Sequence, residues 1–285
     1  MRLDALKLHG AWLGLRLLSV ANPTLRRAGA SRGVQAVLAW MRSGERGLWP
    51  TVESLHLEVE LSPPGSITME ARMELSGIRG AAFGLLLNRD LEVEDATDGE
   101  GRGLFVLHAL GLPGRHHSEA RIVLFCMREP PPAGRATVRL RYGGRCACGR
   151  KGPGWRGILL VDESQVRMTE QSVFYPPVPQ SADGPSLQRT LATLRVRAPP
   201  DFEVAAPGRR TEERPRWTFE PERRVQLCLV AGRFVRHEVR REGLALVVLL
   251  RSEHAELAPR IAAEVENALD FYRTWLGELG TCPVP

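Results

Sequence analysis

The spacing of apolar and polar residues changes twice along the chain, and the longest stretch with one spacing has a period of two residues. Between residues 55 and 61, leucine and valine at the odd positions alternate with histidine and glutamate at the even positions. After a turn at residues 63–65, the same alternation returns from residue 67 to residue 75. Because successive side chains of a strand point to opposite faces of a sheet, the two segments predict a hairpin of half-buried strands.

Short segments of the same kind, separated by turn signals, follow as far as residue 250. No helical pattern lies between them, so residues 51–251 are predicted to form an antiparallel β domain, either a sandwich or twisted sheets. The expected strands after the hairpin cover residues 83–87, 91–93, 104–108, 120–126, 136–142, 158–161, 190–196, 202–205, 217–219, 225–231, 234–239 and 244–250.

The first 50 residues have another pattern, with apolar residues such as Leu6, Leu13 and Leu17 at roughly helical spacing and a second helical stretch at residues 34–41. They carry eight basic and two acidic side chains, a net charge of +6 that equals the charge of the whole chain. We interpret residues 1–50 as a basic helical extension. Three roles stay open: packing on the β domain, an amphipathic helix on a membrane surface or partner through residues 1–20, and a targeting presequence.

Residues 252–285 also have a helical period, because apolar residues recur at three- and four-residue steps from Leu257 to Leu276. Ser252 is the expected N-cap, and Gly277 is expected to end the helix. The predicted fold class is therefore mainly β, with an N-terminal helical extension and a C-terminal amphipathic helix.

Composition narrows the classes of function. With 43% hydrophobic residues among 285, the chain is predicted to fold and to be soluble, and no stretch reaches the ~18 uninterrupted apolar residues of a membrane-spanning helix. Residues beyond the extension are neutral overall, which argues against nucleic-acid binding. The five cysteines are dispersed and odd in number, which favours a reducing compartment. A cytoplasmic location is expected, with a peripheral membrane or organelle-targeted location as the alternative.

Several runs of residues occur in the order found in one family of enzymes. They are VRLRYGG at residues 138–144, FYP at 174–176, VAGRF at 230–234 and FYRTWLGELG at 271–280. Together with the opening hairpin, they resemble the N-terminal half of zinc aminopeptidases of the aminopeptidase N family, which are gluzincin-type metallopeptidases. The resemblance covers residues 52–285. It implies a saddle-like β domain, and it implies that residues 252–285 would open a thermolysin-like catalytic domain.

The zinc-binding motif of that family is missing from the chain. The motif, His-Glu-x-x-His, places two histidines one helical turn apart with a glutamate as general base. The nearest match is HEVRR at residues 237–241, where Arg241 stands in place of the second histidine and a strand is predicted. Neither the histidine pair at 116–117 nor the cysteines at 146 and 148 have the partners or spacing of a metal site. We expect no catalytic residue, metal ligand or cofactor in this chain, with zinc only in a following catalytic domain.

The resemblance also implies a substrate contact, because the family's β domain lends a Glu or Gln that receives the free amino terminus of the peptide. Here Thr169-Glu170-Gln171 precedes Tyr175-Pro176, whereas the family has Thr-Gln-x-Glu before an aromatic-Pro-Cys-x-Asp step. Glu170 is the first choice for the substrate contact, and Gln171 is the second. The alternative is a solvated loop carboxylate with no such role.

Two functions follow. In the first, the chain is the substrate-positioning β domain of a zinc aminopeptidase-like protein, inactive alone and truncated before the catalytic segment, whose partner is the amino terminus of a peptide. In the second, the chain is complete and is a non-catalytic β-sandwich module that binds a protein partner and associates with a membrane surface.

Overall fold

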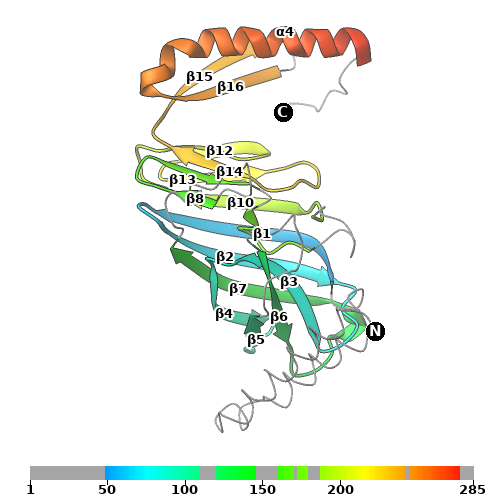
Figure 1. Ribbon diagram of the computed structural model, residues 1–285. Coiled ribbons are helices and arrows are strands. Elements are labelled where there is room, and N and C mark those ends of the chain that lie inside the picture. The colour runs from blue at the N-terminus through cyan, green and yellow to red at the C-terminus, as the bar shows by residue number, and fades with distance from the viewer. Residues whose placement is uncertain are drawn as a thin grey trace, which may run out of the picture.

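The computed structural model describes residues 49–108, 120–145, 159–169, 172–178, 187–241 and 244–276. Within them the chain is mainly β, with four sheets and one long helix near its C-terminal end (Figure 1). This confirms the predicted fold class for the described residues. The predicted helical extension at residues 1–50 lies almost wholly outside them, as do the histidines at 116–117 and the cysteines at 146 and 148.

The largest sheet has seven strands in the order β12-β13-β10-β1-β2-β7-β4. Its first hairpin is the one predicted from the period of two, with Leu57 opposite Ala71 across the two strands. One pair, β1 with β10, is parallel, so the sheet is not antiparallel throughout. The bounds are Arg209–Glu213 (β12), Arg216–Glu220 (β13), Leu191–Arg197 (β10), Thr51–Ser62 (β1), Ser66–Ser76 (β2), Ala136–Arg145 (β7) and Glu92–Asp98 (β4).

Three smaller sheets complete the described β structure. The three-stranded sheet has the order β3-β6-β5, with bounds Ala82–Asn88, Ala120–Cys126 and Phe105–His108. The four-stranded sheet has the order β11-β14-β9-β8, with bounds Glu203–Ala205, Leu229–Gly232, Gln165–Met168 and Leu159–Val161. The third sheet is the hairpin of β15 (Phe234–Arg241) and β16 (Leu244–Arg251). Short 3₁₀ turns are present at Pro132–Gly134 (η2) and Ser252–Leu257 (η4), and the helix α4 covers Ala258–Leu276.

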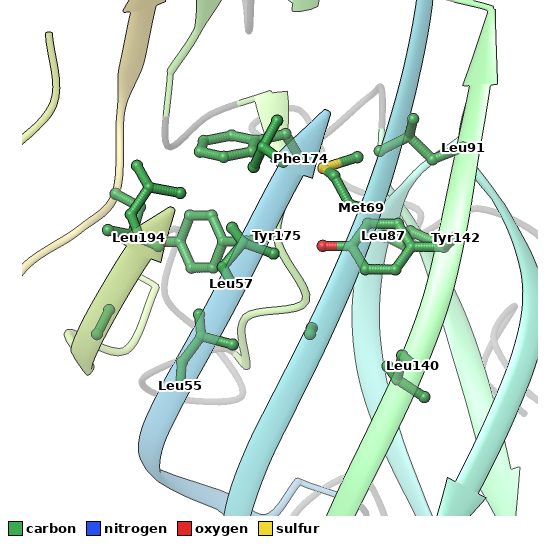
Figure 2. Packing of buried hydrophobic residues seen from close by; sticks show 14 of the residues in the cluster. Leu55, Leu57, Met69, Leu87, Leu91, Leu140, Tyr142, Phe174, Tyr175 and Leu194 are labelled. Carbon is green, nitrogen blue, oxygen red and sulfur yellow. The ribbon is translucent and has the colours of Figure 1, made fainter. Parts of the chain in front are cut away.

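The main hydrophobic core lies between the seven-stranded sheet and the two next-largest sheets. Strands of the large sheet contribute one face, including Leu57, Met69 and Leu140, and the smaller sheets contribute residues such as Leu87 and Met168. Figure 2 shows the side chains of Leu57, Met69 and Leu87 in one cluster, with those of Phe174 and Tyr175. The other face of the large sheet is polar, which is the physical origin of the alternation read from the sequence.

The predicted C-terminal helix is present, but its beginning differs from the prediction. Ser252 is not an α-helix N-cap, because residues 252–257 form a 3₁₀ turn and α4 begins at Ala258. Tighter i to i+3 bonding is common at the start of a helix. No helix among the described residues is long and apolar enough to cross a membrane.

Candidate functional site

The predicted substrate contacts, Glu170 and Gln171, lie outside the described residues, whereas the chain on both sides of them is described. Thr169 follows strand β9, and residues 172–178 form a segment in which every residue is buried. We call Thr169, which is exposed, together with the buried residues 172–178 the buried turn. The main-chain hydrogen bond from Ser172 N to Thr169 O, 3.0 Å long, closes it across positions 170 and 171. The Ser172 hydroxyl donates a second bond, 2.6 Å long, to the same carbonyl oxygen.

Strand β3 holds the buried turn from the side, because β3 is an edge strand of its sheet and has free main-chain groups there. Leu86 N donates to Pro177 O and Asn88 N donates to Val173 O, each over 3.0 Å. The buried amide of Asn88 donates from Nδ2 to Ser172 O over 2.6 Å. The main-chain oxygens of Ser172, Val173 and Pro177 are thus paired inside the protein, as burial requires.

Val173 has a left-handed backbone, with φ of 52°, which is an outlier for a β-branched residue. Its side chain is fully buried in a second, smaller core cluster with Leu86, Ile122 and Leu187. Strain of this kind costs on the order of 1–3 kcal/mol and persists only where surrounding contacts over-determine the conformation. Here the packing and the hydrogen bonds from Asn88 supply those contacts.

The next two residues fasten the turn to the main core. Phe174 and Tyr175 are fully buried, and their rings meet edge to face with centroids 5.2 Å apart. In Figure 2 Tyr175 lies beside Leu57 and Leu194 of the large sheet. Positions 170 and 171 therefore lie between strand β9 and a segment that packs in both hydrophobic clusters.

The described residues do not fit a zinc ion. His237 lies on β15 opposite Val248, as predicted for an ordinary strand residue. Glu238, the residue that would act as general base in the family motif, instead pairs with Arg236 and Arg240. Within the described ranges, no group of three or more His, Cys, Asp and Glu side chains is arranged to hold a metal ion.

The polar face of the seven-stranded sheet has two shallow hollows lined by charged side chains of both signs. Cross-strand ion pairs such as Arg195–Glu58, 3.2 Å long, and Arg139–Glu70, 2.6 Å long, join neighbouring strands on this face. All four side chains are more than a third exposed. Such pairs contribute little to stability and leave no large uncompensated charge for a ligand.

Helix α4 turns most of its large apolar side chains away from its own hairpin. The small side chains of Ala258 and Ala262 are buried against β15 and β16. Tyr272 and Trp275, by contrast, are 52% and 74% exposed. We call the exposed apolar residues of this region the α4 stripe; they are Leu257, Ile261, Phe271, Tyr272 and Trp275. Exposed apolar side chains on one helix are a candidate interaction surface.

No protein-family model and no curated protein matches the chain. Several solved structures match the chain. A mutant of the M1 zinc metallopeptidase from Deinococcus radiodurans, bound to a Tyr-Ser-Ala substrate, matches with a TM-score of 0.51 and 17% identity. The match covers 73% of this chain and 49% of that enzyme. Leukotriene A4 hydrolase from Saccharomyces cerevisiae matches with a TM-score of 0.56 and 13% identity, over 79% of this chain and 35% of the hydrolase. The chain thus shares the fold of a part of these enzymes and spans at most about half their length.

Proposed function

We propose that this chain is the substrate-positioning β domain of a zinc aminopeptidase-like protein, in which the buried turn presents Glu170 or Gln171 to the free amino terminus of a peptide. One observation carries the proposal: the segment that follows these two positions, residues 172–178, is buried, strained at Val173 and packed into two hydrophobic clusters. The fold shared with M1 zinc metallopeptidases supports the choice of substrate class.

The chemistry required of such a group is simple. A peptide ammonium is a compact cation, and a carboxylate that accepts its hydrogen bonds forms a charge-assisted pair. A pair of this kind holds the scissile bond at a fixed distance from the amino terminus only if the carboxylate itself is fixed. The anchoring of residues 172–178 through Asn88 and the buried Phe174 supports this requirement, because it fixes the chain that follows the two positions.

Peptide bond cleavage in this proposal belongs to a second, metal-bearing domain. The α4 stripe supports a separate domain for cleavage, because a following domain would cover the exposed apolar side chains of Trp275 and its neighbours. The same stripe also supports the second candidate function, in which the chain is a non-catalytic module that binds another protein through α4. The two candidates differ in whether the buried turn binds a peptide amino terminus.

The test is a titration of the isotope-labelled chain with the tripeptide Tyr-Ser-Ala, observed through the amide signals of residues 169–178. We expect weak, saturable shifts of these signals with the free tripeptide and none with its N-acetylated form, because acetylation removes the ammonium charge. Glu170→Ala combined with Gln171→Ala should abolish the shifts, whereas the control Glu163→Ala, at an exposed position nearby, should leave them unchanged.

Equal shifts with the free and the acetylated tripeptide would contradict the proposal. An absence of any shift at millimolar peptide, together with capture of a protein partner that Trp275→Ser abolishes, would favour the second candidate.

A further inference from the structure

Residues 234–276, which comprise β15, β16, η4 and α4, form a unit with its own small hydrophobic cluster. Val248, Ala258 and Ala262 are its buried members. Every buried residue of the main core and of the second cluster lies at or before position 231. In Figure 1 this C-terminal unit lies at one end of the molecule, beyond β12 and β14. No hydrophobic cluster of the described residues spans the two parts, so apolar burial does not fix their relative orientation.

Charged groups bridge the two parts instead, around the buried carboxylate of Glu203 on β11. Arg210 Nη1 lies 2.6 Å from Glu203 Oε1, and Arg214 Nη2 lies 3.3 Å from Oε2. The third arginine, Arg236, belongs to β15 of the C-terminal unit, and its Nη1 lies 3.6 Å from Oε1. The side chain of Glu203 is only 7% exposed. One carboxylate of the β domain therefore faces three guanidinium groups, one of which comes from the other part.

Two outer carboxylates hold the arginines in position. Glu212 lies 2.5 Å from both Arg210 and Arg214. Glu238 lies 2.5 Å from Arg236 and also pairs with Arg240. Each set has the sequence Arg-x-Glu-x-Arg, and alternate residues of an extended chain lie on one face. Arg236, Glu238 and Arg240 all belong to strand β15, whereas Arg214 lies in the turn that follows β12.

The main chain between the two parts passes through a close contact. Arg233 N donates to Ser164 O over 3.1 Å. A Cβ atom at Gly232 would lie 2.7 Å from Ser164 O and 2.8 Å from the Phe234 ring, so only glycine fits there. Residues 232–233 are therefore a closely packed link between the two parts. Glu203 lies opposite Gly232 in the pairing of β11 with β14, so its ion pairs lie directly beside this link.

We propose that Glu203, Arg210, Arg214 and Arg236 form an ionic joint that fixes the orientation of the C-terminal unit on the β domain. The joint sets where α4 and its apolar stripe point. Removing the carboxylate leaves three like charges close together and partly desolvated, so the arginine from β15 separates from the other two. The inference does not depend on the substrate proposed for the buried turn.

The test measures how the two parts of the full chain tumble, by ¹⁵N relaxation and residual dipolar couplings. In the wild type we expect one rotational correlation time and one alignment tensor for both parts. In Glu203→Gln and in Arg236→Met, the C-terminal unit should acquire a shorter correlation time and a tensor of its own. The control Glu58→Gln removes an exposed ion pair on the large sheet and should leave both quantities unchanged.

Arg236→Met keeps Glu203 paired with two arginines of the β domain, so it decides the question if Glu203→Gln fails to fold. The joint is refuted if the folded variants at both positions tumble as one body with wild-type dipolar couplings, or if the wild type already shows two independent parts.

Discussion

The side chain of Asp162 fixes the turn that precedes strand β9 and the candidate site. It lies in the turn between β8 and β9, and its Oδ1 accepts hydrogen bonds from Ser164 N, Gln165 N and the Ser164 hydroxyl, each 2.8–2.9 Å long. Burial on its own would raise the pKa of Asp162, but these hydrogen bonds outweigh it and hold the pKa below its ordinary value. Strand β9, which leads into the buried turn, is thus fixed at its start.

Replacing Asp162 by alanine should therefore destabilise the chain by about 1–2 kcal/mol, the range typical for a lost side-chain cap. Glu163→Ala, one residue away and exposed, is the control and should change the free energy of unfolding by less than about 0.5 kcal/mol. Urea unfolding at pH 7 measures both variants. Equal effects of the two substitutions would contradict the role assigned to Asp162.

The difference in unfolding free energy between wild type and Asp162→Ala should depend on pH in a definite direction. A carboxyl group whose pKa is lower in the folded than in the unfolded protein stabilises the fold above its unfolded pKa and loses that contribution as pH falls through the folded pKa. The ordinary value for Asp162 is 3.8. The stability gap between wild type and Asp162→Ala should be constant at neutral pH and should narrow in acid below that value.

Asn88 is the residue on which the buried turn depends most directly. Its side chain is 2% exposed, donates to Ser172 O and accepts a hydrogen bond from Asp90 N. Asn88→Ala leaves a buried carbonyl without its partner, at a cost of about 1–3 kcal/mol. We expect lower stability and faster hydrogen exchange at the amides of residues 172–178. Exchange unchanged there, with stability lost elsewhere, would contradict the assignment.

At the level of single residues, the sequence could predict the candidate site only in part. Glu170 and Gln171 were chosen by resemblance and remain a prediction, since they lie outside the described residues. The left-handed conformation of Val173 has no sequence signal, because valine normally favours extended backbone. Asn88 likewise looks like the polar end of an ordinary strand. Its role arises from a contact with residues 84 positions away, which a local pattern cannot reveal.

Strands were predicted well from the sequence where one face of the strand is buried and the other is exposed to solvent. Strand β1 follows this rule from Leu55 to Ser62, after a register shift between Val52 and Ser54, so its pattern was sufficient there. Strand β12, with the sequence RRTEE, was missed because it is a polar edge strand with no apolar residue to mark it. Strand β9 was missed because four residues give too short an alternation. The parallel pairing of β1 with β10 was also beyond the sequence, since the burial pattern of β10 is the same in either direction.

Helix α4 offers a test of which of its faces contacts the hairpin. Ala262 is 2% exposed and Ala263 is exposed, so adjacent positions have opposite environments. Ala262→Leu should overpack the contact with β16 and cost about 1–3 kcal/mol. Ala263→Leu should be neutral within about 0.5 kcal/mol. Thermal unfolding of the two variants compares them directly, and the reverse order would mean that the helix presents another face.

At the scale of the whole molecule, the domain bounds read from the sequence stay a prediction. The sequence placed β15 and β16 with the β domain, within residues 51–251. In the structure their apolar side chains cluster with α4. The pattern could not show this, because alternation reports that a strand has a buried face and does not report which element covers it. We propose the boundary at Gly232, where the main chain leaves the four-stranded sheet.

We propose above that the chain holds the amino terminus of a peptide and that another domain carries out cleavage. That account is tested most directly by assaying the purified chain, supplied with zinc, for release of tyrosine from Tyr-Ser-Ala, with bound zinc quantified in the same sample. We predict no release above background and less than one zinc bound per chain, because the described residues contain no arrangement that fits the metal. Turnover accompanied by one bound zinc per chain would contradict the account.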